Sequence, residues 1–325
     1  MWDFDFPRAV GLMVRTFPYL VFRIVVYGGI AVAYVVVTGF GAGIGYGLGW
    51  FGGPDSQAGF AFWGGLIGFG LTATAIYLLR EYLLYTVKAG HIAVLVELMD
   101  DKDLPDGQGQ VAYGAKVVKE RFVQSSALFG LDQLVKGVIR AISGFVESIA
   151  SVLPIPGLNG LVSLFRAFMK VAVGFVDEVI LAHAIRTRSD NAWASAREAL
   201  VLYGQNYQLM LKNAAFIALF TYIIAILVFL FMLAPAAGLV YLMPGSWSAG
   251  GLVFAIIFAW AVKAAVLEPL AITLMMQVFF KVTAGQTPNP EWDAKLCQMS
   301  DKFVEIKDKA FSGAAGSPAP GAPAE

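Results

Sequence analysis

A lysine and a glutamate lie near the middle of the last long apolar stretch of this chain, residues 252–280. Lys263 and Glu268 are its only charged residues, and Pro269 follows them directly. A charge at the centre of a bilayer costs roughly 2.5–3.5 kcal/mol on insertion scales, so such residues usually face a partner, a polar cavity or a substrate path. Two hypotheses stay open: a structural ion pair or snorkelling lysine, and a polar site within a membrane bundle.

The positions of these two charges predict that they do not share one face of an ideal α-helix. Lys263 and Glu268 are five residues apart, whereas helical neighbours are three or four apart. Pro269 cannot donate a backbone hydrogen bond, so we expect a kink beside Glu268.

Asp177 and Glu178 form a second group of candidates, because acidic side chains are too short to snorkel far. His183 follows them in the same helical pattern. It could relay protons, or it could be a packed, hydrogen-bonded side chain. Interfacial anchoring is the expected role of three arginines, Arg80, Arg186 and Arg188.

Composition indicates an integral membrane protein. The 325 residues are 58% hydrophobic and only 14% charged, with a mean hydropathy of +0.70, whereas soluble domains are about 25% charged. The 23 basic and 23 acidic residues balance, so no nucleic-acid partner is expected. One cysteine and two histidines make a zinc site unexpected. Without a phosphate-binding loop or nucleophile elbow, we expect no enzyme, no cofactor and no metal.

Four stretches are long and apolar enough to span a bilayer, at about 17–38, 59–85, 209–233 and 252–280. The connections 39–58 and 234–251 contain no lysine or arginine, whereas 86–208 contains 12 of the 23 basic residues. Basic residues mark the cytoplasmic side. We therefore expect both termini in the cytoplasm and the protein in a bacterial inner, or plasma, membrane.

The central segment contains two apolar runs separated by a Pro-Ile-Pro-Gly turn at 154–157. Three arrangements remain open for the hairpin at 130–182. It can enter and leave the membrane on one side, which requires cover by protein or water. It can lie flat at the inner surface, or it can form two further spans at 130–153 and 157–182.

Glycines recur every four residues in two series between residues 39 and 53. The first is Gly39, Gly43 and Gly47, and the second is Gly41, Gly45, Gly49 and Gly53. Small residues at this spacing let helix backbones approach closely in lipid. They predict close packing within the chain or a homo-oligomer. A flexible gate or a pore lined by carbonyl groups is the alternative.

Near the C-terminus, apolar residues follow a heptad pattern, at Trp292, Leu296, Met299, Phe303, Ile306 and Ala310. Fewer than three heptads favour packing on the bundle over self-association. The complete organisation that we expect is an interfacial segment at 1–16, two spans with a glycine-rich outer loop at 17–85, cytoplasmic amphipathic helices and the embedded hairpin at 86–208, two spans at 209–284, an amphipathic helix at 285–312 and a disordered tail at 313–325.

From about Gly174 onwards, the order of features resembles the C-terminal half of choline transporter-like proteins. The matching elements are the helix with Asp177, the small-residue stretch 191–199, Lys212 with Asn213, and the charged helix around 302–305. The resemblance implies transport of a small cation such as choline. Aromatic rings each stabilise such a cation by roughly 0.5–2 kcal/mol. The rings available on the last two spans are Tyr222, Phe229, Phe254, Phe258 and Trp260.

These observations predict an all-α membrane bundle that transports or conducts a small polar or cationic solute. The candidate path residues are Lys263, Glu268, Asp177, Glu178, Trp260 and Tyr222. The alternative is a membrane scaffold that recruits a partner through helices at 113–140 and 290–311. Transport predicts a polar cavity that reaches Glu268, whereas a scaffold predicts charges that satisfy one another. The bilayer and a small solute are the expected partners.

Overall fold

The computed structural model describes residues 2–79, 83–121, 134–142, 144, 176–189, 191–242 and 248–315. Its first helices are α1 (Phe6–Arg15), α2 (Phe17–Leu48), the 3-10 turn η1 (Gly49–Gly52), α3 (Pro54–Leu79), α4 (Tyr85–Met99), the turn η3 (Pro105–Gly107) and α5 (Gln110–Arg121). They are followed by α8 (Val176–Arg186), α9 (Ala192–Gln205), α10 (Tyr207–Tyr241), α11 (Ser248–Val262), η5 (Lys263–Leu267), α12 (Glu268–Val282), α13 (Pro290–Met299) and α14 (Asp301–Ala315).

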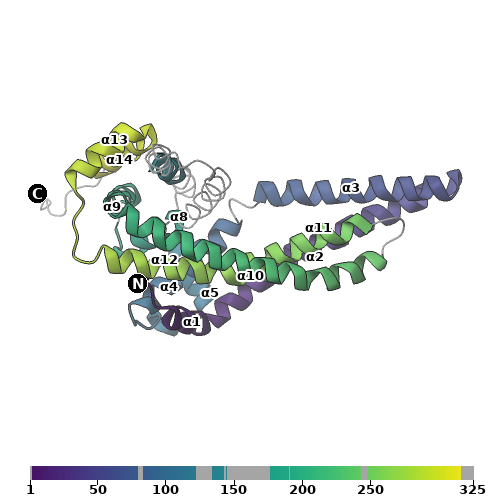
Figure 1. Cartoon of the computed structure of the whole chain (residues 1–325), viewed down its shortest axis with the longest axis horizontal. Coiled ribbons are helices and arrows are strands. Elements are labelled where there is room, and N and C mark those ends of the chain that lie inside the picture. Colours follow the sequence, from purple (N-terminus) through teal and green to yellow (C-terminus); the bar gives the residue numbers. More distant parts are fainter. Residues whose placement is uncertain are drawn as a thin grey trace, which may run out of the picture. The chain divides into compact units, whose positions relative to one another are not determined.

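The chain is an all-α integral membrane protein. Four helical segments are long and apolar enough to cross a bilayer, at Phe17–Gly52, Pro54–Leu79, Tyr207–Tyr241 and Gly250–Val282 (Figure 1). This confirms the four expected spans, because each run of about 20 or more apolar residues satisfies its backbone groups internally as a helix.

The expectation of a glycine-rich outer loop at 39–58 is wrong. Helix α2 continues through most of these glycines to Leu48, and only η1 and Gly53 separate it from α3. Gly53 has a φ of 84°, a conformation that favours glycine and lets the chain reverse. Close packing along α2 therefore takes the place of a loop.

Helices α2 and α3 touch through the backbone along one of the two glycine series. A β-carbon on Gly45 would lie 2.0 Å from the Phe60 carbonyl oxygen, and one on Gly41 would lie 2.3 Å from that of Gly64. Gly43 and Gly47, of the other series, have nothing within 4 Å. The predicted close packing is confirmed within the chain for Gly41 and Gly45, and the expectation that Gly43 shares this role is wrong.

The chain divides into two compact units, which are described separately below. The membrane unit contains 15–88 and 220–270, and the head unit contains 1–14, 89–219 and 271–325. Helices α1, α4, α10 and α12 contribute residues to both units. In the head unit, all of residues 89–99 of α4 are buried, including His91 and Glu97. A helix that is buried all round belongs to a core, so this part of the predicted amphipathic region is a core helix.

The heptad residues at the C-terminus pack against α9 inside the head unit. Leu296, Phe303 and Ile306 are fully buried. The helix is not continuous, because Ser300 adopts an extended conformation between α13 and α14. The seam thus packs on α9 of the same chain, and packing on the membrane bundle, as the sequence favours, stays a prediction. Most of the hairpin at 130–182 and most of the tail at 313–325 lie outside the described residues.

Candidate functional site

The two charges of the last span lie on a π-helical segment rather than on an α-helix. The segment is η5, and the Glu268 N–H donates to the Lys263 carbonyl, five residues back. A π-turn places residues i and i+5 one above the other. Lys263 Nζ consequently lies 2.8 Å from Glu268 Oε1. The expectation that these two side chains do not share a face is therefore wrong.

Pro269 explains why this turn leaves a carbonyl group open. In an α-helix the Glu268 N–H would donate to the Ala264 carbonyl, but here it donates to the Lys263 carbonyl. Pro269, the next residue, has no N–H. The Ala264 carbonyl therefore has no backbone donor from the next turn. Arg23 of α2 fills this position, because its Nη2 donates to the Ala264 oxygen. Prolines inside apolar helices are tolerated where neighbouring groups satisfy the freed backbone.

Arg23 is the residue that sequence reasoning missed. It is 0% exposed although it lies six residues inside the first span. Its Nε and Nη1 have no hydrogen-bond partner among the described residues, and its guanidinium lies 5.4 Å from the centre of the Tyr27 ring. Its depth within an apolar run was a signal that could have identified it.

Basic side chains of the membrane unit act on Glu268. Lys88, Lys263 and Arg23 each act electrostatically on its carboxylate, and Lys263 pairs with it at 2.8 Å. Among the described residues, the open donors of this group are Nε and Nη1 of Arg23. They suit a strongly hydrogen-bond-accepting group.

The five aromatic residues that the resemblance suggested form separate contacts. Phe254 and Phe258 stack with their ring centroids 6.4 Å apart, and both contact an apolar cluster that also includes Phe229. Trp260 packs edge-on against Tyr27. Tyr222 faces a cation of the chain itself, Lys263 Nζ, at 5.4 Å.

Asp177 and Glu178 belong to the head unit, whereas Lys263 belongs to the membrane unit. Asp177 Oδ2 lies 3.5 Å from Lys136 Nζ, and Glu178 is buried. His183 lies on the same helix, 3.8 Å from Glu198. Burial lowers the pKa of His183, an effect that Glu198 opposes and Arg186 reinforces. These residues join helices of the head unit.

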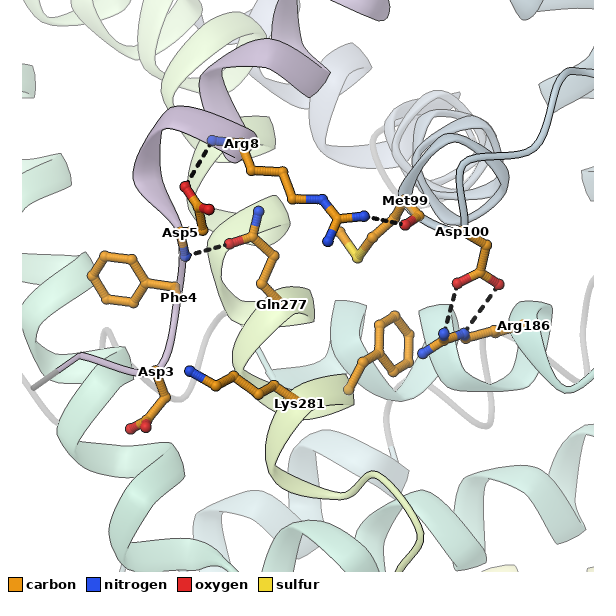
Figure 2. A pocket seen from close by; sticks show the side chains of 10 residues that line it. Asp3, Phe4, Asp5, Arg8, Met99, Asp100, Arg186, Gln277 and Lys281 are labelled. Atoms are coloured by element: carbon orange, nitrogen blue, oxygen red, sulfur yellow. Dashed lines mark hydrogen bonds and ion pairs between the residues drawn. The ribbon is translucent and has the colours of Figure 1, made fainter.

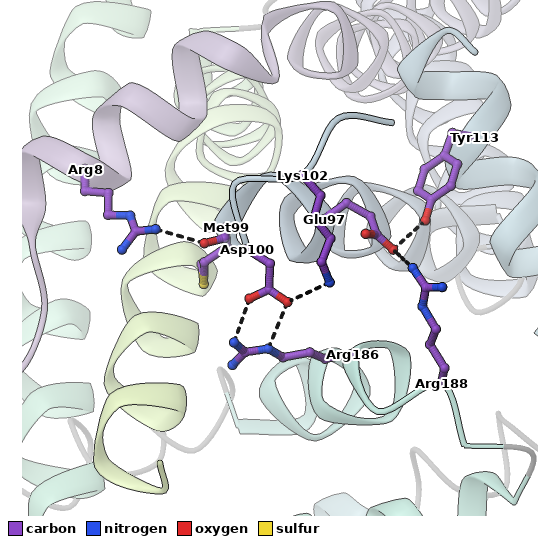
Figure 3. Close-up of polar contacts among 8 residues, drawn as sticks. All are labelled: Arg8, Glu97, Met99, Asp100, Lys102, Tyr113, Arg186 and Arg188. Carbon is purple, nitrogen blue, oxygen red and sulfur yellow. Dashed lines mark hydrogen bonds and ion pairs between the residues drawn. The ribbon is translucent and has the colours of Figure 1, made fainter. Parts of the chain in front are cut away.

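Arg186 and Arg188 hold α8 to the end of α4 (Figure 3). Arg186 Nη2 lies 2.6 Å from one Asp100 oxygen, and its Nε lies 3.2 Å from the other. Arg188 donates to buried Glu97 at 3.2 Å, as does the Tyr113 hydroxyl at 3.0 Å. Ion pairs within the chain, rather than interfacial anchoring alone, therefore explain these arginines. Arg80 lies outside the described residues.

A cavity of about 350 Å³ lies in the head unit, lined by the N-terminal segment, α1, α4, α8 and α12 (Figure 2). Neither Lys263 nor Glu268 lines it. Gln277 and Lys281, which do, are one helical turn apart on α12. Sequence reasoning missed both, although a glutamine inside an apolar run is a polar signal of the same kind as Arg23.

Comparison with known proteins gives no relative from which a function can be transferred: no protein-family model, curated protein or solved structure matches this chain. Fold and composition place it among α-helical integral membrane proteins. The resemblance to choline transporter-like proteins stays a prediction.

Proposed function

We propose that this protein moves a small polar solute across the membrane, and that Arg23, Lys263 and Glu268 form its binding site. The observation that carries this proposal is the buried guanidinium of Arg23, which has two donors without partners in the part of the chain that the structure describes. Buried polar groups in native proteins are almost always hydrogen-bonded, so an exception calls for a function. A solute that accepts hydrogen bonds would complete this group.

The open donors narrow the class of solute. Arg23 offers Nε and Nη1, which have no partner among the described residues, and a guanidinium has no acceptor. These donors favour a solute with an anionic or strongly accepting group over the choline-like cation that the resemblance implies. Helices interrupted by a π-turn are frequent at functional sites, and the turn at Lys263–Leu267 places a carbonyl and an ion pair beside Arg23.

Flux measurements test the proposal. The purified protein is reconstituted into proteoliposomes and assayed with a panel of chloride, phosphate, small carboxylates and choline. We expect flux in the wild type and at least a tenfold loss in Arg23→Met. Arg23→Lys keeps the charge but loses the planar arrangement of donors, so its flux should be intermediate.

The double change Lys263→Met with Glu268→Gln removes both charges together and avoids leaving one buried charge alone, which typically costs about 3–5 kcal/mol. We expect this variant to fold and to lose flux, while Lys302→Gln, which removes an exposed lysine on α14, keeps it. Normal flux in the double variant would remove both residues from the site.

A scaffold is the second candidate, because the Lys263–Glu268 pair is closed at 2.8 Å, as that hypothesis predicts. The apolar seam of 290–311 is already buried against α9, so recruitment would have to use other surfaces. No flux in the wild type for any solute of the panel would favour the scaffold.

Our proposal includes an inner-membrane location with both termini in the cytoplasm. The support is the uneven distribution of lysine and arginine between the connections. Single cysteines at Asp55 and Ser189, in a Cys297→Ser background, can be labelled with an impermeant maleimide on intact cells. We expect labelling at position 55, and labelling at position 189 would reverse the topology.

A further inference from the structure

The cavity of the head unit has the size and lining of a small-molecule site. Its volume of about 350 Å³ lies within the roughly 300–1,000 Å³ that ligand pockets occupy. Its polar lining carries three acidic and three basic side chains, from Asp3, Asp5, Asp100, Arg8, Arg186 and Lys281. Phe4, Met99 and Phe280 supply the apolar part of the wall.

The acidic side chains of the cavity are already occupied by donors of the chain. Asp3 accepts from Asn213 Nδ2 at 2.9 Å, and this hydrogen bond together with Lys212 lowers the pKa of Asp3. Asp5 Oδ1 accepts from the Arg8 N–H at 2.9 Å, and both oxygens of Asp100 accept from Arg186. Each of the three carboxylates thus already accepts at least one hydrogen bond from the chain.

Gln277 lines the cavity and has a buried amide donor without a partner among the described residues. The residue is 9% exposed. Its Oε1 accepts from the Asp5 N–H at 2.8 Å, which fixes the orientation of the amide, since the reverse would set two N–H groups against each other. Its Nε2 has no hydrogen-bond partner among the described residues. Figure 2 shows Gln277 between Asp5 and Arg8.

Lys281 is the second open donor. It lies one turn after Gln277 on α12 and extends towards Asp3 (Figure 2). Its positive charge acts on Asp3, but it makes no hydrogen bond or ion pair within the described part of the chain. Among the described residues, a neutral N–H donor and a cation of this cavity thus remain without hydrogen-bond partners.

We propose that this cavity binds an oxyanion, a phosphate or carboxylate group, held by Gln277 Nε2 and Lys281 Nζ. Charge-assisted hydrogen bonds from lysine suit such oxygens, and Phe4 and Phe280 can contact the remainder of the ligand. The oxyanion can belong to a soluble small molecule or to the headgroup of an anionic lipid, because both present the same acceptor atoms. This site is separate from the group around Arg23 and does not depend on transport.

Calorimetric titration and thermal unfolding of the full-length protein test this proposal. One arm titrates inorganic phosphate and acetate into protein held in nanodiscs of phosphatidylcholine. The other arm compares the unfolding midpoint in such nanodiscs with that in nanodiscs containing phosphatidylglycerol. Binding in the first arm identifies a soluble oxyanion as sufficient, and a rise in midpoint only in the second identifies the lipid headgroup.

Two variants and a matched control connect the binding to the cavity. Gln277→Glu keeps the acceptor for the Asp5 N–H but replaces the open donor with a negative oxygen, and Lys281→Gln removes the cation. Each should weaken the observed binding at least tenfold, whereas Lys119→Gln, an exposed lysine of α5, should not change it. No binding in either arm, or equal binding in all variants, would overturn the proposal.

Discussion

In the membrane unit, α2 and α3 approach each other through glycine backbones, whereas the head unit is held together by large buried side chains. Gly41 and Gly45 leave no space for a β-carbon, while Phe303, Ile92 and Leu200 are fully buried in the head unit. Helices in lipid gain little from the hydrophobic effect and depend on close van der Waals contact. In contact with water, burial of apolar area drives packing.

One charged residue from each unit shows the difference between a paired and an open buried group. In the head unit, Asp293 accepts from Arg197 at 2.9 Å and from Lys307 at 2.6 Å. In the membrane unit, Arg23 is buried with two donors open. Charges that are fully paired stabilise a structure, whereas a buried group that is left open marks a place where stability has been given up. The comparison teaches that the open group is the better functional candidate.

The largest effect that we expect comes from adding one methyl group to the glycine contact. Gly45→Ala would place a β-carbon 2.0 Å from a backbone oxygen of α3, and the helices must separate, at a cost of about 3 kcal/mol. Gly43→Ala, on the open series, should be neutral or stabilising by about 0.5 kcal/mol. Unfolding in detergent measures both variants. Equal stability would show that α2 and α3 do not depend on this contact.

The second prediction concerns Asp293, the paired carboxylate of the head unit. Burial alone would raise the pKa of Asp293, but the hydrogen bonds from Arg197 and Lys307 outweigh it and lower the pKa. Asp293→Ala leaves both basic groups without their acceptor, and we expect a loss of about 1–3 kcal/mol in unfolding free energy. Glu305→Gln removes an exposed carboxylate paired with Lys309 and should change little.

Arg23→Met provides the contrast between the two units. It removes one hydrogen bond to the Ala264 carbonyl but also removes two unsatisfied donors. We therefore expect its unfolding free energy to stay within about 1 kcal/mol of the wild type, although flux is lost. A destabilisation larger than that of Asp293→Ala would instead make Arg23 a structural residue.

The smallest effect that we expect is a decrease in stability at acidic pH that depends on His183. The pKa of folded His183 lies below its unfolded value of 6.5 because of burial, so the unfolded state binds more protons as the pH falls below 6.5. The free energy of unfolding therefore keeps its full value above pH 6.5. Below that pH it falls, by at most about 1.4 kcal/mol per pH unit, until the pKa of folded His183 is passed. In His183→Gln, the unfolding midpoint should change less with pH between pH 7.5 and 5.5 than it does in the wild type. An unchanged slope would exclude this histidine as the cause.

Local features of the sequence were enough to predict the class and the spans. The four apolar runs and the charges at Lys263 and Glu268 follow from composition and spacing alone, because a lipid-exposed segment must satisfy its own backbone as a helix. The burial of Leu296, Phe303 and Ile306 followed equally from their periodicity.

Only the tertiary structure decided which of these residues act together. Both glycine series have the same spacing, and only the position of α3 distinguishes Gly45 from Gly43. The π-turn brings Lys263 and Glu268 onto one face, where an α-helix would separate them. Arg23 donates to the carbonyl of Ala264, 241 residues away in the sequence. These features depend on contacts between distant segments, and local periodicity carries no information about which neighbour a helix face meets.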